Sequence, residues 1–415
     1  MNPGENTSIS KGNHFHRYMQ YASSLLSNYK GAEPLHLYLK KYFSSNKKHG
    51  SRDRKQITAL CYYYFRLGIG VSNEMNREDK LILSTFLLEN KSSSLLYSLK
   101  PEWNDKIHLS LADKLKAVKD VFNVDEIFPF EDELSTEINS NQFHLSFLTQ
   151  PKLYIRIRPG FHERVIKKLN TAGILFGKIN DDCLAFANNE KVSNVIHIDE
   201  EAIIQDYNSQ RIGKFITSYI PHLTSHISVW DCCAASGGKS ILAYDILKNI
   251  QLTVSDTRKN ILENLKSRFA KAGIKNYQSF VADLSISTPL KEIKEKPDFI
   301  IADVPCSGSG TWARTPEQLH FFSKKDINKY ASLQQKIVQN ATQYLKEGGY
   351  LLYITCSVFT KENEDNVEFI KEKLNLELIE SQYLKGYETQ ADTLFAAMFK
   401  RPPCSPKEGS ETRSL

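Results

Sequence analysis

The chain has 415 residues, of which 41% are hydrophobic and 25% are charged. This length favours two or three domains, and the composition is that of a globular protein rather than a disordered one. No apolar run reaches the roughly 18 residues of a membrane span, and the first residues lack the layout of a signal peptide. We therefore expect a cytoplasmic protein with no membrane partner.

The net charge of +6 is unevenly distributed along the chain. Residues 1–80 contain 13 Lys or Arg and six Asp or Glu, which gives them a net charge of +7. A basic module on a near-neutral remainder favours a polyanionic partner, nucleic acid before a membrane surface. A solvated helical face without a partner is the alternative interpretation.

Seven cysteines are scattered along the chain. Their odd number and wide spacing do not fit a disulfide framework. There is no Cys-x-x-Cys pair and no pair of histidines at zinc-ligand spacing, so we expect no structural metal. The thiols should be reduced, and each should serve as a nucleophile or as a small core residue.

Helical periodicity dominates the first third of the chain. Short amphipathic segments broken by Gly, Ser and Asn lie at residues 20–29, 34–43, 53–68 and 80–90. We assign Cys61, inside the third apolar run, to the core. Residues 1–135 are therefore predicted to form an all-α domain.

From about residue 140 the pattern becomes one of strands with a single helix. Residues 152–160 alternate as a strand does, and residues 161–173 form an amphipathic helix that Gly173 ends. Three short strand candidates follow, at residues 174–179, 183–187 and 195–199. We expect a small α/β unit over residues 140–215.

Strands and helices alternate over residues 216–402. The predicted strands are 227–233, 252–256, 278–283, 298–305 and 349–357, and the predicted helices are 240–250, 258–273 and 326–349. This alternation predicts a doubly wound parallel sheet, with its ligand beyond the carboxyl ends of the strands. Residues 403–415 are expected to be a disordered tail.

The stretch "DCCAASGGKS" (231–240) ends as a phosphate-binding loop does. Such a loop needs its first glycine at position 233, where this chain has Cys233. Without that glycine the chain cannot double back around a phosphate, which disfavours an NTPase. Residues 308–313 fit a dinucleotide-binding pattern, but Arg314, Thr315 and Pro316 follow instead of a helix, which disfavours that site too.

Small loop residues favour instead a pocket for S-adenosylmethionine, which has no phosphate and needs close backbone approach. The candidate loop residues are Cys233, Ala234, Ala235, Ser236, Gly237, Gly238 and Lys239. Carboxylates end three successive strands: Asp256, suited to ribose hydroxyls, Asp283, near the expected adenine amino group, and Asp303. Each acid alone could equally be a helix cap or turn residue.

Cys306 and Cys356 follow the fourth and fifth predicted strands, in polar turns where the ligand is expected. A core role is usual for a free cysteine and suits Cys232 better than these two. A thiolate that adds to carbon 6 of a pyrimidine makes carbon 5 reactive toward a methyl donor, after which the carbon-5 proton and the thiol leave. Asp303 could hold or donate the proton that stabilises the adduct.

These motifs resemble those of the RNA cytosine-5 methyltransferases of the Sun or ribosomal-RNA methyltransferase B type. The matching stretches are "DCCAASGGKS", "ADVPCSGSGTWAR" and "GGYLLYITCSVFTKENEDNVEFI", with "YIRIRPG", "IQDYNSQRIGKF" and "DTLFAAMFKR" around them. The resemblance covers roughly residues 145–402. More loosely, residues 50–68 are similar to the helical NusB-like domain that precedes the catalytic part in the bacterial ribosomal-RNA branch.

The resemblance implies a role for each thiol. Cys356, in the Thr-Cys-Ser motif, would be the nucleophile, and Cys306, in the Pro-Cys motif, would resolve the adduct and release product. DNA cytosine-5 methyltransferases use the Pro-Cys thiol instead, so the Thr-Cys-Ser motif favours RNA. The implied cofactor contacts are residues 233–239, Asp256, Asp283 and Asp303. The family usually has Pro, Ala and Arg where this chain has Ser236, Val304 and Asn260.

We expect an S-adenosylmethionine-dependent methylation of cytosine carbon 5 in RNA, most simply 16S ribosomal RNA. The target base must leave its stack to be methylated. Residues 1–135 would be a NusB-like RNA-binding domain, residues 140–215 an RRM-like unit, and the protein a monomer. A tRNA substrate and a non-catalytic ribosome-assembly factor are the alternatives, although the latter has no use for two thiols beside a cofactor.

Overall fold

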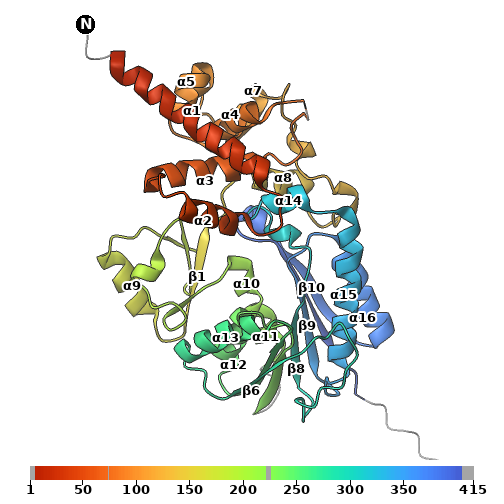
Figure 1. Cartoon of the computed structure of the whole chain (residues 1–415). Coiled ribbons are helices and arrows are strands. Elements are labelled where there is room, and N and C mark those ends of the chain that lie inside the picture. The colour runs from red at the N-terminus through yellow and green to blue at the C-terminus, as the bar shows by residue number, and fades with distance from the viewer. Residues whose placement is uncertain (1–4, 73, 221–225, 404–415) are drawn as a thin grey trace, which may run out of the picture. The chain divides into compact units, whose positions relative to one another are not determined.

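The computed structural model in Figure 1 describes residues 5–72, 74–220 and 226–403. The chain forms two compact units. The first contains residues up to 151 together with 308–326 and 386–392, and the second contains 152–307, 327–385 and the residues from 393 onward. These units divide the chain differently from the predicted domains 1–135, 140–215 and 216–402, which remain predictions. All but the first residue of the predicted tail 403–415 lies outside the described residues.

Helices build the first unit. They are α1 (Glu5–Asn28), α2 (Leu35–Ser45), α3 (Ser51–Arg66), α4 (Arg77–Leu88), α5 (Ser94–Leu99), α6 (Pro101–Asn104), α7 (Leu111–Ala117), α8 (Ser140–Phe147) and α14 (Glu317–Phe321), with 3-10 turns η1 (Val124–Glu126), η2 (Glu131–Glu133), η4 (Ser309–Thr311) and η6 (Gly386–Glu388). Asn76 caps α4 by accepting a 2.9 Å hydrogen bond from the backbone N of Asp79. All four predicted helical segments fall in α1 to α4, and Cys61 is fully buried, as expected.

Aromatic and polar contacts explain why residues 308–326 belong to the first unit. Trp312 is 1% exposed, and its ring centroid lies 6.0 Å from that of Phe128. The backbone N of Leu35 donates to Oε1 of Glu317 at 3.2 Å, across 282 residues of sequence. Contacts at such separations leave no periodic pattern, so the sequence could not predict this division.

A four-stranded antiparallel sheet with one helix begins the second unit. Its elements are β1 (Leu153–Ile157), α9 (His162–Thr171), β2 (Gly177–Lys178), β3 (Cys183–Phe186), η3 (Val192–Asn194) and β4 (Ala202–Ile204), and the strand order is β2-β3-β1-β4. The predicted strand at 195–199 is wrong, because only Ile198 makes an isolated bridge there. Asp199 has a φ of 73°, so the chain turns and forms its strand three residues later.

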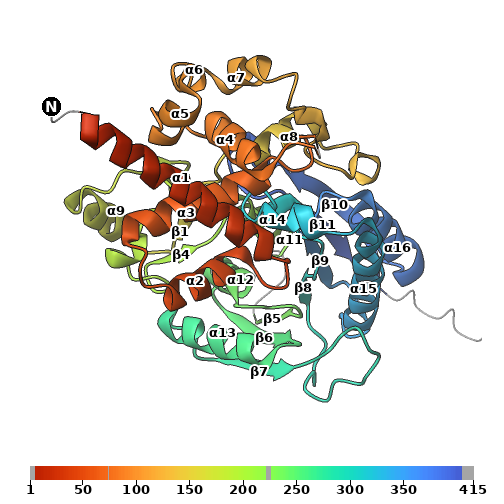
Figure 2. The same cartoon turned by 45° about the horizontal axis from the view of Figure 1, so that its top comes forward.

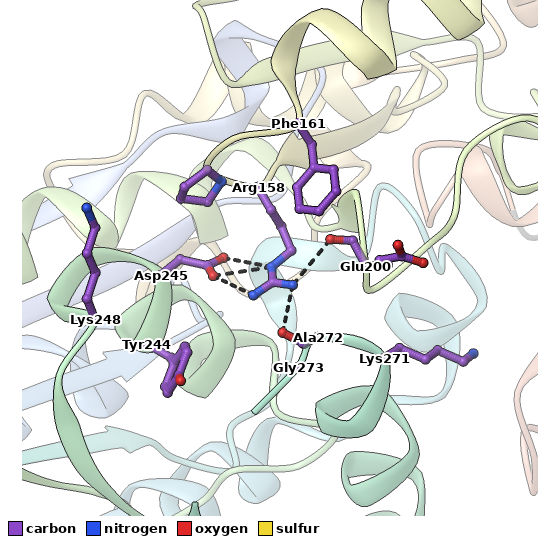
Figure 3. A pocket seen from close by; sticks show the side chains of 10 residues that line it. Arg158, Phe161, Glu200, Tyr244, Asp245, Lys248, Lys271, Ala272 and Gly273 are labelled. Atoms are coloured by element: carbon purple, nitrogen blue, oxygen red, sulfur yellow. Dashed lines mark hydrogen bonds and ion pairs between the residues drawn. The ribbon is translucent and has the colours of Figure 1, made fainter. Parts of the chain in front are cut away.

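Both faces of this small sheet are covered. Ile155 and Leu184 on one face pack against Leu169 of α9. On the other face, Arg156 and Arg158 form ion pairs with Asp245 at 2.7 and 2.8 Å. Figure 3 shows Arg158 held between this carboxylate and backbone oxygens, including that of Ala272 at 2.9 Å. Since RRM domains stack RNA bases on an open sheet face, the RRM-like character of this unit remains a prediction.

A seven-stranded sheet forms the rest of the second unit. Its elements are α10 (Tyr207–Arg211), α11 (Gly213–Tyr219), β5 (Ile227–Asp231), α12 (Gly238–Leu247), β6 (Ile250–Asp256), α13 (Lys259–Lys271), β7 (Tyr277–Val281), β8 (Phe299–Asp303), α15 (Lys324–Thr342), β9 (Tyr350–Thr355), η5 (Thr360–Glu362), α16 (Glu364–Leu374), β10 (Glu377–Leu384) and β11 (Leu394–Lys400). The strand order is β10-β11-β9-β8-β5-β6-β7. This is an α/β architecture of the Rossmann-like type, as predicted.

The sheet is mixed, which corrects the prediction of a parallel one. β5 to β9 pair in parallel, whereas β11 runs antiparallel to β9 and to β10. The strand order reverses at β5, which lies between β6 and β8. In sheets of this kind the crevice at the reversal, beyond the carboxyl ends of the strands, is where ligands bind.

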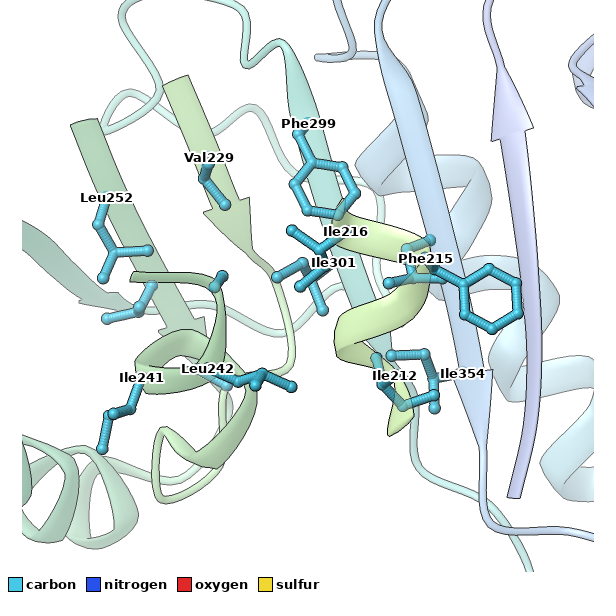
Figure 4. Packing of buried hydrophobic residues seen from close by; sticks show 14 of the residues in the cluster. Ile212, Phe215, Ile216, Val229, Ile241, Leu242, Leu252, Phe299, Ile301 and Ile354 are labelled. Carbon is cyan, nitrogen blue, oxygen red and sulfur yellow. The ribbon is translucent and has the colours of Figure 1, made fainter. Parts of the chain in front are cut away.

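Buried aliphatic side chains fix the sheet to its helices. Figure 4 shows Val229 and Ile301 of the sheet beside Ile216 of α11, and Leu242 of α12 belongs to the same cluster. In Figure 2, α13 lies alongside β6 and β7, while α15 and α16 lie beside β9 and β10. Helices therefore cover both faces of this sheet, which leaves its strand ends as the accessible edge. A membrane-spanning helix is absent from the described residues, none of whose helices combines sufficient length and hydropathy.

Candidate active site

The loop after β5 turns tightly before it enters α12. Ala235 and Gly237 have φ values of 45° and 82°, and the backbone N of Gly237 donates to the carbonyl of Ala234 at 2.8 Å. A Cβ atom at Gly237 would lie 2.6 Å from the Phe269 ring. Only glycine fits position 237, because it tolerates this φ and has no Cβ. The small residues thus bring the backbone itself to the strand-end edge, as a cofactor without phosphate requires.

Asp256, at the end of β6, holds this loop in place. Its Oδ2 accepts from the backbone N of Ala235 at 3.0 Å, and its Oδ1 accepts from the backbone N and Nε of Arg258 at 2.9 and 3.0 Å. Burial raises the pKa of Asp256, but the hydrogen bonds and charge of Arg258 outweigh it and leave the pKa below its ordinary value. Asp256 is therefore an ionised acceptor at the position predicted for ribose hydroxyls, and Arg258 shares it.

Ser236 stands where the resembling family usually has proline. Arg268 of α13 donates to the carbonyl oxygen of Ser236 at 2.9 Å and to its Oγ at 3.0 Å. The same guanidinium donates through Nε to Asp199 at 2.8 Å. These bonds restrain the loop where a proline ring would otherwise stiffen it.

Lys239 and Asp303 form an ion pair across the sheet reversal. Lys239 Nζ lies 2.6 Å from Asp303 Oδ2, which joins the start of α12 to the end of β8. Burial lowers the pKa of Lys239, but the Asp303 carboxylate outweighs this effect and raises the pKa above its usual value. The Cys356 sulfur acts in the same direction, which identifies it as an electrostatic neighbour of this pair.

A buried acid lies beneath the loop. Asp231, the last residue of β5, has no exposed surface, and its Oδ2 accepts from the Ser240 hydroxyl at 2.6 Å. Burial is the largest cause that raises the pKa of Asp231 to about 7. Asp231 was not among the predicted site residues, although it closes a strand as Asp256 and Asp303 do.

The two predicted reactive thiols meet. Cys306 Sγ lies 2.9 Å from Cys356 Sγ, and the backbone N of Cys356 donates to Cys306 Sγ at 3.3 Å. The hydrogen bond with Cys356, and then burial, raises the pKa of Cys306 well above its ordinary value. Cys306 is thus held as a protonated thiol beside Cys356. Both side chains are partly exposed, whereas Cys232 is buried as expected.

Two further predicted site residues, Asp283 and Cys233, belong neither to the ion pair nor to the pair of thiols described above. Asp283 is exposed, and its Oδ1 accepts from the backbone N and the hydroxyl of Ser285 at 2.9 and 2.6 Å. Cys233 is half-buried, and a hydrogen bond with Cys232, followed by burial, raises its pKa well above the usual value. Cys233 is therefore a neutral part of the loop wall. Within the described residues there is no group of three or more His, Cys, Asp or Glu that could hold a metal ion.

A polar network beneath the thiols was missed by the sequence analysis. Its centre is Glu362, which accepts hydrogen bonds from Ser307, Ser357 and Gln334. In the sequence, Glu362 belongs to the polar run "TKENED", which reads as a solvated helix start. Its burial could have been suspected only from its closeness to Cys356.

Comparison with known proteins shows which family part of this chain resembles. Residues 220–402 match the family described as 16S rRNA methyltransferase RsmB/F. Ribosomal RNA small subunit methyltransferase B of Shewanella oneidensis is 28% identical over 190 residues, 46% of this chain and 43% of the relative. The 28S rRNA (cytosine-C(5))-methyltransferase of Mus musculus is 28% identical over 159 residues, 37% of this chain and 20% of the relative. The chain thus spans less than half the length of either relative.

Similarity to a solved structure extends over nearly the whole chain. The crystal structure of PH0851 superimposes with a TM-score of 0.65 at 18% identity, and the match covers 94% of this chain and 98% of that one. At this identity the likeness concerns the fold. The fold therefore extends beyond the segment that matches the family.

Proposed function

Residues 220–402 belong to the RsmB/F family of 16S rRNA methyltransferases, and from this premise we propose that the chain methylates carbon 5 of a cytosine in RNA. The single observation that carries this proposal is the 2.9 Å contact between the sulfur atoms of Cys306 and Cys356. Both lie just past the carboxyl ends of adjacent strands, and Cys356 is an electrostatic neighbour of the Lys239–Asp303 pair. A binding protein has no need of two thiols in this position.

Cys356 is proposed as the nucleophile. Its thiolate adds to carbon 6 of the cytosine, which converts carbon 5 into an enamine-like nucleophile. S-adenosylmethionine, when bound, supplies the electrophilic methyl group. The carbon-5 proton then leaves, the carbon–sulfur bond breaks, and the Cys356 thiolate is regenerated. Cys306 is proposed to act in this release.

Asp303 is proposed to hold the cytosine ring. Paired with Lys239 at 2.6 Å, it is a carboxylate that accepts hydrogen bonds. It can accept one from the cytosine amino group, or from a protonated ring nitrogen as the adduct forms. The ion pair therefore favours holding a proton on the ring over donating one to it.

The cofactor is proposed to lie along the loop 233–239. The backbone can be approached at Gly238, where an added Cβ would have no heavy atom within 4 Å, and Asp256 offers acceptors for ribose hydroxyls. Asp283 remains the proposed neighbour of the adenine amino group. The residues present fit S-adenosylmethionine, because acidic acceptors and small side chains, rather than a phosphate cradle, line this edge.

Small-subunit ribosomal RNA is the proposed substrate, on the strength of the family that residues 220–402 match. The basic residues of the first unit would bind the RNA backbone in a NusB-like manner, and the protein would act as a cytoplasmic monomer. Bisulfite sequencing of total RNA from cells with and without the protein tests this proposal. A protected cytosine that depends on the protein should lie in 16S rRNA. Protection in tRNA would overturn the substrate, and no protected site would overturn the activity.

A further inference from the structure

Glu362 joins the two loops that carry the thiols. It lies at the end of η5 and has no exposed surface. Its Oε2 accepts from the backbone N of Ser307 at 2.9 Å, and its Oε1 accepts from the hydroxyl of Ser357 at 2.6 Å. Ser307 and Ser357 each directly follow a cysteine, so one carboxylate ties down both thiol-bearing turns.

Gln334 completes the hold on the first turn. Its Nε2 donates to Glu362 Oε2 at 2.7 Å and to the carbonyl oxygen of Pro305 at 3.0 Å. Pro305 and Ser307 flank Cys306, so the backbone is anchored on both sides of that thiol. Gln334 has no exposed surface and belongs to α15.

Asn363 does the same for the second turn. Its Oδ1 accepts from the hydroxyl of Thr355 at 2.6 Å, and its Nδ2 donates to the carbonyl oxygen of Ser357 at 2.9 Å. Tyr353 donates to the carbonyl oxygen of Glu362 at 2.6 Å, which fixes η5 itself. Thr355 and Ser357, which flank Cys356, are therefore both bonded to Asn363, and Ser357 is also bonded to Glu362.

A carboxylate suits this centre better than an amide does. Every group that meets Glu362 is a donor: a backbone N–H, a hydroxyl and a side-chain amide N–H. A glutamine has one acceptor oxygen, and its NH₂ group would face at least one of these donors without a partner. Burial raises the pKa of Glu362, and these hydrogen bonds oppose that effect.

We propose that Glu362 is a positioning residue that sets the separation of Cys306 and Cys356 through Ser307 and Ser357. It does not touch substrate, because its side chain is fully covered. The expected effect on catalysis rests on the proposed function. The hydrogen bonds by which Glu362 holds the two turns do not depend on that function. The side-chain hydrogen bond between Cys306 and Cys356 is the largest cause that raises the pKa of Cys306; burial and the charges of Cys356 and Glu362 add to it.

Glu362→Gln tests this role against Glu368→Gln, which removes the same charge from an exposed residue of α16 that pairs with Lys371 at 2.8 Å. For Glu362→Gln we expect kcat to fall at least about tenfold while KM for RNA changes less than about twofold, because RNA contacts remain. Glu368→Gln should match the wild type in both. Unchanged kcat in Glu362→Gln would overturn the proposal.

A second readout needs neither RNA nor methyl transfer. The rate at which iodoacetamide alkylates Cys306 and Cys356 at pH 8, followed by mass spectrometry, reports the thiolate fraction and the accessibility of each thiol. We expect Cys306 to react at least about threefold faster in Glu362→Gln, because its neighbouring negative charge and its anchor are both lost. Equal rates in the variant and the wild type would overturn the inference, whatever RNA methylation shows. Altered rates in a chain that methylates no RNA would contradict only the proposed function.

Ser357→Ala keeps the Glu362 carboxylate and tests the same positioning role if the Glu362→Gln variant does not fold. It removes the 2.6 Å bond from the Ser357 hydroxyl to Glu362, together with the bonds that this hydroxyl accepts from the Ser307 hydroxyl at 3.2 Å and from the backbone N of Phe359 at 3.1 Å, so kcat should fall with KM retained. In the double variant the two effects should be less than additive, because both substitutions break the same link. Full additivity, or a wild-type kcat in Ser357→Ala, would contradict positioning through Ser357.

Discussion

Cys306 Sγ and Cys356 Sγ lie 2.9 Å apart although 50 residues separate them. The register of two neighbouring parallel strands creates this contact, since Asp303 of β8 pairs with Ile354 of β9 and each chain then turns toward the crevice. Because Cys306 is held protonated and Cys356 lies beside the Lys239–Asp303 pair, the two thiols differ in environment. This difference supports separate roles, addition for Cys356 and release for Cys306.

The role of Cys306 in release predicts a trapped intermediate. Cys306→Ala should accumulate a covalent complex with native RNA in the presence of S-adenosylmethionine, because addition through Cys356 is retained while breakdown of the adduct is slowed. Denaturing gel electrophoresis would detect the complex. Cys232→Ala, which changes a buried thiol of the same sheet, is the control and should give none. If Cys306→Ala turns over as the wild type does, Cys306 is structural.

The loop geometry predicts that two adjacent glycines differ in their tolerance to substitution by alanine. Gly237→Ala should lower the free energy of unfolding by about 1–2 kcal/mol or more, because it combines a left-handed φ with a Cβ 2.6 Å from Phe269. Gly238→Ala adds a Cβ with nothing within 4 Å and should be close to neutral. Urea denaturation measures both, and calorimetry should show weaker S-adenosylmethionine binding for Gly237→Ala. Equal stability of the two variants would contradict the described turn.

Much of the site could be predicted because its residues end strands. The aspartates and thiols follow apolar, β-branched runs, and parallel strands bring their carboxyl ends to one edge. Glu362 could not be predicted, because its partners Ser307 and Gln334 lie 55 and 28 residues away. The strands β10 and β11 were not among the predicted strands, and their antiparallel pairing with each other and with β9 is a long-range contact that no local pattern reveals.

The buried acid under the loop predicts a pH-dependent stability. In the unfolded chain Asp231 has an ordinary carboxyl pKa near 3.8, and in the folded chain burial raises its pKa to about 7. Between these values the folded state keeps a proton that the unfolded state has released, so this group destabilises the fold progressively as pH rises from about 4 to 7. Above pH 7 its contribution is constant.

Asp231→Asn removes that titration. Relative to the wild type, the variant should become more stable as pH rises from about 4 to 7, by at most about 1.4 kcal/mol per pH unit, and the difference should then level off. Chemical denaturation at several pH values measures it. Asp283→Asn, at an exposed acid, is the control. A stability difference between Asp231→Asn and the wild type that does not vary with pH would show that Asp231 titrates normally.

The excess of Lys and Arg in residues 1–80 predicts salt-sensitive RNA binding. Exposed lysines and arginines gather at the junction of α2 and α3, where they include Lys47, Lys48 and Arg52. If they bind phosphates, the logarithm of affinity should fall linearly with the logarithm of salt concentration, and neutralising all three should reduce the slope. Fluorescence anisotropy with labelled rRNA fragments measures both. A flat response to salt would exclude this role.

The most direct test of the mechanism is adduct formation on RNA that carries 5-fluorocytidine at the target position, because fluorine at carbon 5 cannot leave as a proton and the adduct cannot break down. In the presence of S-adenosylmethionine, the wild type and Cys306→Ala should both form a complex that survives denaturation, and Cys356→Ala should form none. A denaturation-resistant complex with Cys356→Ala would contradict the assignment of Cys356 as the nucleophile.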